Sequence, residues 1–146
     1  MGAQRAYLYT SAAVERYVTE EGSSRVDALY REAHAGNLMI GFSVWNIGEV
    51  AVVLDKYEKR GVIGDAREVF ARFIGETRLL ARLNQLRLVS LKYDALASAI
   101  GYVFKHGIYI ADAVQHASAR GFDAFLTYDK RLARLAEVEG LRLYPG

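Results

Sequence analysis

The sequence predicts an α/β domain in which a mostly parallel central sheet is flanked by helices. Short apolar runs alternate along the chain with longer stretches of helical periodicity, which is the pattern of folds built from successive strand–helix units. Glycines follow most of the helical stretches, where they commonly end a helix. The chain has 146 residues, 52% of them hydrophobic, and no linker-like segment divides it. We therefore expect one domain that spans residues 1–146.

In the first half of the chain, serines stand at the expected starts of three helices. An apolar run predicts a buried first strand, and Ser11 is a favourable N-cap for the helix that follows it. Ser23 or Ser24 is expected to cap the next helix, and Ser43 a later one. The expected elements are strand 6–9, helix 11–21, helix 23–35, strand 37–42, helix 44–60 and helix 65–84.

The second half of the chain repeats this alternation. A run of alternating apolar and polar residues predicts the third strand, and Asp129 is a natural N-cap for the last helix. The expected elements are strand 86–90, helix 93–106, helix 110–120, strand 122–127, helix 129–139 and strand 141–144.

Polar residues follow the first and the fourth expected strands. Tyr9, Thr10 and Ser11 come after the first strand, and Thr127 and Asp129 come after the fourth. Ligands of parallel sheets bind beyond the carboxyl ends of the strands. If these two strands are neighbours, both groups of residues line one crevice.

Composition and motifs exclude several classes of function. The sequence has no cysteine, which excludes disulfides, thiolate metal sites and cysteine nucleophiles, and agrees with a reducing, cytoplasmic location. No apolar stretch is long enough to span a bilayer, so no membrane association is expected. The formal net charge is only +2, so a nucleic-acid site would have to be local. No Ser-His-Asp signature, P-loop or glycine-rich dinucleotide motif is present.

Three acidic residues stand where a metal site would need them, although each also has an ordinary explanation. Glu49 lies in the apolar stretch IGEVAVVL and either projects into the crevice or belongs to a solvated face. Asp112 opens a helix, where an acid complements the helix dipole, but its apolar neighbours predict partial burial and a need for a cation or donors. Asp129 is a candidate cap as well as a candidate ligand. His116, one turn after Asp112, is either a general base or an ordinary helix residue.

Together with the strand–helix layout, these residues resemble the pattern of PIN-domain proteins, and within that family of the VapC toxins of toxin–antitoxin pairs. The segments that carry the resemblance are YLYTSAAVERYVTEEGS, IGEVAVVL and IYIADAVQHASARGFDAFLTYDKRLA. The family pattern is a strand-ending Asp followed by Thr/Ser-Ser, a helical Glu, an Ala-Asp-Ala helix start and an Asp after a Thr-aromatic pair. Glu49, Asp112 and Asp129 match the last three positions, in an order that covers nearly the whole chain.

The resemblance implies a ribonuclease that hydrolyses RNA with Mg²⁺ or Mn²⁺ held by Glu49, Asp112 and Asp129. Mg²⁺ prefers oxygen ligands and is typically held by a few carboxylates together with substrate phosphate. Such an ion activates water and stabilises the leaving oxygen. The resemblance also implies a homodimer and a small VapB-like antitoxin that covers the acidic crevice.

Tyr9 departs from the family pattern, because it stands where the family's first Asp would be. A phenol has an ordinary pKa of about 10, so it is neutral at pH 7 and a poor ligand for Mg²⁺. The next acid along the chain is Glu15, which would have to reach back from the following helix. Three outcomes stay open: weakened metal binding with residual activity, a catalytically impaired protein that binds RNA or an antitoxin, or an inactivating substitution in this version of the protein.

Arginines and tyrosines offer candidate partner surfaces. Arg67, Arg72, Arg78 and Arg82 lie along the expected helix 65–84 and form either a solvated charged face or a contact for an RNA backbone. The chain also has 10 tyrosines, and exposed ones suit base stacking or a protein interface.

Overall fold

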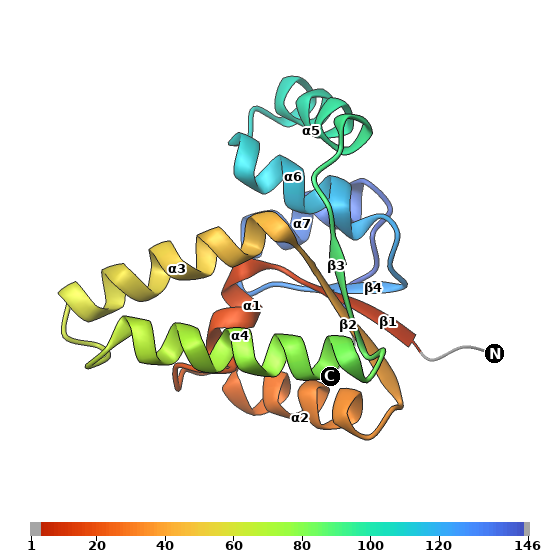
Figure 1. Cartoon of the computed structure of the whole chain (residues 1–146). Helices are drawn as coiled ribbons and strands as arrows, with labels where there is room; N and C mark the ends of the chain where they lie inside the picture. The colour runs from red at the N-terminus through yellow and green to blue at the C-terminus, as the bar shows by residue number, and fades with distance from the viewer. Residues whose placement is uncertain (1–3, 145–146) are drawn as a thin grey trace.

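The computed structural model describes residues 4–144, and within them the predicted alternation of strands and helices is confirmed (Figure 1). The strands are β1 (Gln4–Leu8), β2 (Leu38–Ser43), β3 (Leu86–Val89) and β4 (Ala124–Leu126). The helices are α1 (Thr10–Glu15), α2 (Ser23–His34), α3 (Val44–Lys59), α4 (Ala66–Arg82), α5 (Tyr93–His106), α6 (Ile110–Ala119) and α7 (Lys130–Val138).

The strands form an all-parallel, four-stranded sheet in the order β3–β2–β1–β4. The first and fourth strands are therefore neighbours: Leu8 pairs with Leu126, and the Tyr9 backbone N–H donates to the Leu126 carbonyl at 3.0 Å. Parallel strands end at the same edge of the sheet. The segments that follow β1 and β4 consequently meet at that edge, as the crevice prediction requires.

The central strand β1 is buried on both faces, so its alternating side chains enter two different clusters. Ala6 and Leu8 belong to the large cluster that α1, α2 and α4 cover, whereas Tyr7 and Tyr9 pack with Phe125 of β4 in a second cluster that α7 closes. Tyr9 is thus directed away from the large core by the period-two geometry of the strand.

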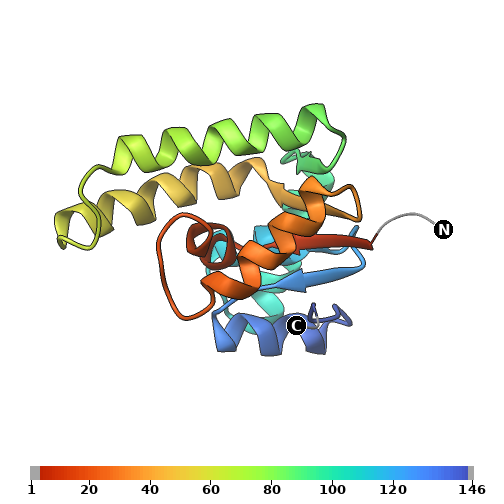
Figure 2. The same cartoon turned by 90° about the horizontal axis from the view of Figure 1, so that it is seen from below.

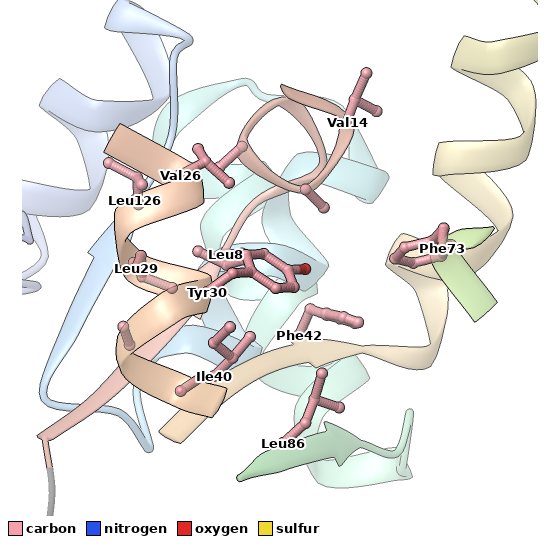
Figure 3. Close-up of a cluster of buried hydrophobic side chains, with 14 of the residues drawn as sticks. Leu8, Val14, Val26, Leu29, Tyr30, Ile40, Phe42, Phe73, Leu86 and Leu126 are labelled. Carbon is pink, nitrogen blue, oxygen red and sulfur yellow. The ribbon is translucent and has the colours of Figure 1, made fainter. Parts of the chain in front are cut away.

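The large cluster packs helices against the sheet (Figure 3). Leu8 of β1 and Ile40 of β2 meet Tyr30 of α2 there, and Phe42 packs on Phe73 of α4 with ring centroids 5.6 Å apart. Beyond this core, α3 and α4 lie side by side as a long helical pair that projects past the sheet in both views (Figures 1 and 2). The start of α3, at the end of β2, remains close to the sheet edge.

The first helix differs from the prediction at both ends. It begins at Thr10 with Tyr9 as its N-cap, and it ends at Glu15 rather than near residue 21. Ser11 lies in the first turn, and its Oγ accepts a hydrogen bond from the backbone N–H of Tyr128 at 2.9 Å. The predicted capping role of Ser11 is therefore wrong, because its hydroxyl is used to tie α1 to the turn after β4.

The predicted start of α2 is wrong for a similar reason. The N-cap is Gly22, so neither Ser23 nor Ser24 caps this helix. Ser23 Oγ accepts from the backbone N–H of Glu20 at 2.8 Å and donates to the Glu15 carbonyl at 2.7 Å. The serine therefore fastens the loop between α1 and α2 instead of starting a helix.

Two other predicted caps are confirmed, and one predicted strand is not. Ser43 and Asp129 each accept a backbone N–H at the start of α3 and α7, and Asp65 does the same at the start of α4. The expected strand 141–144 is reduced to one parallel bridge between Leu143 and Phe125. It lies beside β4, where the Phe125 N–H donates to the Arg142 carbonyl at 2.8 Å and the Tyr144 N–H donates to the Phe125 carbonyl at 2.7 Å.

Candidate functional site

A cavity of about 700 Å³ opens at the edge of the sheet where β1 and β4 end. Its walls come from α1, α3, α6 and the turn that leads into α7. Seven of the residues that the sequence suggested for a site line it: Tyr9, Thr10, Ser11, Glu49, Asp112, Thr127 and Asp129. His116 does not line it. The fold thus gathers in one place residues that are far apart in the sequence.

Glu49 reaches the cavity from the second turn of α3 and is half-buried, which argues against a fully solvated face. Its Oε1 accepts two hydrogen bonds of 2.8 Å, one from Thr10 Oγ1 and one from Gln115 Nε2. Burial raises the pKa of Glu49, and the nearby negative charge of Asp112 raises it further, while the two hydrogen bonds act in the opposite direction. The carboxylate is therefore positioned by neutral donors from α1 and α6.

Gln115 is the site residue that sequence reasoning missed, and Asn46 is its buried partner. Asn46 Nδ2 donates to Gln115 Oε1 at 2.8 Å and to Thr10 Oγ1 at 3.1 Å. Asn46 Oδ1 in turn accepts the backbone N–H of Ser43 at 2.9 Å, in the capping box of α3. The only sequence signal for Gln115 is its place one turn after Asp112, as an amide among apolar helix residues. This network fixes the side chains that hold Glu49.

Asp112 lies in the first turn of α6 and is partly buried, as its apolar neighbours predicted. Burial raises the pKa of Asp112, the negative charge of Asp129 raises it further, and Arg131 opposes the shift. The position also agrees with the ordinary explanation that an acid complements the helix dipole.

Asp129 has the capping role that its sequence context predicted. Its Oδ1 accepts the backbone N–H groups of Arg131 at 3.0 Å and Leu132 at 3.1 Å. Thr127 Oγ1 accepts the N–H of Asp129 at 3.2 Å and lies 3.2 Å from Ser11 Oγ. The two hydroxyls therefore hold the turn that presents Asp129 at the rim of the cavity.

Tyr9 directs its hydroxyl to His116, whose Nδ1 lies 2.6 Å away. The Tyr9 side chain is buried and packs edge-on against Tyr7 with centroids 5.5 Å apart. Burial raises the pKa of Tyr9 and lowers that of His116 to about 4, so both groups are neutral at pH 7. Tyr9 thus brings no charge to the cavity, and His116 is a buried helix residue behind the cavity wall.

Glu15 also lines the cavity, one turn along α1 from Ser11. Its Oε2 is buried and has no hydrogen-bond partner within the described residues. Burial, together with the nearby Glu20, raises the pKa of Glu15 to about 7. Glu20 lines the cavity beside Glu15 and accepts a hydrogen bond from the hydroxyl of Tyr57 at 2.8 Å. This end of the cavity is therefore acidic as well.

The carboxylate oxygens that line the cavity are suitable ligands for a hydrated divalent cation, although the side chains are not assembled into a metal site. Within residues 4–144, no group of three or more histidine, aspartate or glutamate side chains could hold a metal ion. Glu49, Asp112 and Asp129 nevertheless interact unfavourably, since Asp112 raises the pKa of Glu49 and Asp129 raises that of Asp112. A cation would relieve this repulsion. Mg²⁺ accepts such oxygen ligands while it keeps several waters, which suits an open arrangement.

Comparison with known proteins identifies the fold. No family model matches the sequence, and no curated protein matches it either. Among solved structures, the Mycobacterium tuberculosis toxin VapC20, described as cleaving the sarcin–ricin loop, superposes with a TM-score of 0.65 and 14% identity, over 89% of this chain and 94% of that chain.

A parallel four-stranded sheet flanked by helices, with an acidic cavity beyond its strand ends, defines the class of fold. The chain has a PIN-like fold of the VapC type. Sequence identity at this level shows the fold and leaves the activity to be argued from the site. In the part of the chain that the structure describes, no helix is long and apolar enough to cross a membrane.

Proposed function

We propose that this protein is a divalent-metal-dependent endoribonuclease of the VapC toxin type. The observation that carries the proposal is that Glu49, Asp112 and Asp129 line one cavity beyond the ends of β1 and β4. The repulsion among these carboxylates supports it, because a bound cation would compensate charges that the protein itself compensates only in part.

In this proposal, Glu49, Asp112 and Asp129 hold Mg²⁺ or Mn²⁺. The ion, when bound, supplies a Lewis acid for the phosphodiester and lowers the pKa of a bound water. Thr10 and Gln115 orient Glu49 through their hydrogen bonds to its Oε1. Metal ligands need such supporting partners, since a loosely held ligand weakens the site.

The proposal extends to partners and location. RNA is the substrate, a small VapB-like antitoxin covers the cavity, and the protein acts as a homodimer in the cytoplasm, with residues 1–146 as one domain. The uncompensated negative charge of the cavity supports a basic side chain on the antitoxin, because complementary charges steer association and suppress wrong partners.

The first experiment measures metal binding and RNA cleavage in the same protein preparations. Wild type is expected to bind Mn²⁺ at millimolar concentration in calorimetry. Asp112→Asn is expected to bind it about ten-fold more weakly, since even loss of a residue that only supports a metal ligand typically lowers metal affinity by this factor or more. Asp123→Asn is the matched control, because Asp123 pairs with Arg5 outside the cavity. Absence of metal binding by wild type would contradict the proposal.

A second candidate function is a catalytically impaired PIN-fold protein that binds RNA or an antitoxin. Tyr9 favours it, because the phenol is buried against His116 where the resemblance expects a carboxylate. Tyr9→Asp is then expected to create or increase cleavage, whereas Tyr9→Phe, which removes only the hydroxyl, is not. Far-ultraviolet circular dichroism verifies that both variants fold. If wild type cleaves RNA measurably and Tyr9→Asp leaves the rate unchanged, the argument from the missing ligand fails.

A further inference from the structure

Two exposed aromatic side chains flank the acidic part of the cavity, and the mechanism proposed above uses neither. Trp45 is 40% exposed and Tyr109 is 73% exposed, and both line the cavity. Large exposed apolar groups that gather at a cavity commonly mark a binding surface. These two rings are therefore candidates for contact with a bound ligand.

The backbone places each ring beside one of the carboxylates. Trp45 precedes Glu49 by four residues on α3, so the two side chains lie on the same face of the helix, one turn apart. Tyr109 is the N-cap of α6 and precedes Asp112 by three residues. A ligand that extends from the carboxylates toward the N-terminus of either helix meets an aromatic ring.

We propose that Trp45 and Tyr109 form a base-stacking subsite that selects RNA with unpaired nucleotides next to the phosphate at the acidic residues. This inference rests on the proposed function, because it takes RNA to be the ligand of the cavity. Stacking of a base on an aromatic side chain is worth about 1–3 kcal/mol and tolerates any base, since every base has a flat π-face. A base within a duplex has both faces covered, so loops and ends are bound in preference to paired segments.

Charge around the rings agrees with a nucleic-acid ligand. Lys56 lines the same cavity from α3, and Lys130 and Arg131 are exposed at the start of α7, next to Asp129. Cationic side chains near a stacking platform bind the phosphate backbone in a sequence-independent way. The subsite therefore combines base contacts from α3 and the start of α6 with phosphate contacts from α3 and α7.

The single tryptophan of the chain makes the subsite directly measurable. Trp45 is the only tryptophan, so fluorescence excited at a wavelength that tyrosine does not absorb reports on its surroundings alone. The full chain is titrated with a single-stranded hexauridylate, with an abasic oligonucleotide of the same length, and with a duplex of the same length. We expect quenching by hexauridylate, with at least ten-fold weaker binding and no quenching for the other two.

Tyr109→Leu tests the second ring without involving the tryptophan. It keeps an apolar side chain but removes the π-face, and we expect it to weaken binding of hexauridylate by about 5- to 150-fold, the ratio that corresponds to the stacking energy. Phe104→Leu is the matched control, because Phe104 is 85% exposed on α5 and does not line the cavity. Its affinity for hexauridylate is expected to equal that of wild type.

The outcomes separate this inference from the proposed function. RNA cleavage with an unchanged KM in Tyr109→Leu and no quenching of Trp45 overturns the stacking subsite and leaves the nuclease proposal standing. Quenching of Trp45 by hexauridylate that weakens in Tyr109→Leu, without any RNA cleavage, supports the subsite. It favours the second candidate function, a catalytically impaired protein that binds RNA. Equal quenching by the abasic oligonucleotide, or quenching by a basic peptide and not by RNA, assigns the rings to backbone or protein contacts and overturns the inference.

Discussion

Two half-buried glutamates, Glu76 on α4 and Glu49 on α3, have pKa shifts of opposite sign. Glu76 forms a hydrogen-bonded ion pair with Arg16 at 2.8 Å, and it also accepts hydrogen bonds from Tyr17 at 2.6 Å and His34 at 2.9 Å. Burial acts to raise the pKa of Glu76, but these partners outweigh it and lower the pKa to about 2. Glu49 has only the neutral donors Thr10 and Gln115, and its pKa is raised.

The difference separates a carboxylate that the fold pairs with a cation from one that has only neutral hydrogen-bond donors. The Glu76 cluster contains its own cation, so it joins α1, α2 and α4 without help from outside. The cavity carboxylates repel one another, and burial disfavours their charged forms. Perturbed carboxylates in a cavity are candidates for function for this reason.

Matched Glu→Gln substitutions test this contrast where the expected effect is largest. Glu76→Gln leaves Arg16 with the ion pair to Asp27 but removes the charge that Arg16, Tyr17 and His34 share, so we expect a loss of about 1–3 kcal/mol in the free energy of unfolding. Glu49→Gln keeps an acceptor for Thr10 and Gln115, so we expect a change within about 0.5 kcal/mol, in either direction. Urea unfolding at neutral pH measures both.

Equal losses in the two variants would remove the distinction. They would mean that Glu49 is as much a part of the folded framework as Glu76. A larger loss of unfolding free energy for Glu49→Gln than for Glu76→Gln would reverse the distinction and would weaken the case for a functional cavity.

The fold and the location of the cavity follow from local sequence signals. Apolar runs set the strands, and the caps Ser43 and Asp129 act through backbone groups within three residues. Ser11 has the same chemistry as Ser43 but a different role, because Tyr128, 117 residues away, competes for its hydroxyl. Capping propensity cannot reveal such a competitor.

The finer structure of the site depends on contacts across the sheet. Gln115 has no signature as a helix residue, and its role appears only when α6 meets Glu49, 66 residues away. The neutrality of Tyr9 was predictable from its phenol, whereas its bond to His116, 107 residues away, was not. Glu15 looked too distant from the strand end, yet the short α1 places it in the same cavity.

Metal titration tests the same contrast between Glu49 and Glu76 through a smaller expected change in the free energy of unfolding. A ligand present at about ten times its Kd stabilises the folded state by about 1.4 kcal/mol when it does not bind the unfolded chain. We expect this gain with Mg²⁺ in wild type and in Glu76→Gln, because Glu76 lies outside the cavity. In Glu49→Gln the gain is expected to shrink to less than half, as measured by the shift in urea midpoint. A gain that persists undiminished in Glu49→Gln places the ion elsewhere.

The last expected effect is a dependence of stability on pH that comes from Glu15. Its pKa is about 7 in the folded protein against an ordinary value of 4.5, so between these values the folded state holds a proton that the unfolded chain has lost. Its contribution to stability is therefore fully present below pH 4.5 and is lost as the pH rises through 7. Glu76 behaves in the opposite sense, because its lowered pKa gives stability above pH 4.5 that is lost as the pH falls through 2.

Glu15→Gln isolates this contribution, since the amide stays neutral at every pH. We expect the variant to gain stability relative to wild type between pH 5 and pH 8, measured as the difference in free energy of unfolding at each pH. His116 titrates in both proteins and cancels in that difference. Glu137→Gln, at an exposed position on α7, controls for the loss of one negative charge. If the difference between Glu15→Gln and wild type were the same at pH 5 and pH 8, Glu15 would be ionised throughout, and the cavity would hold one more uncompensated charge for a cation to meet.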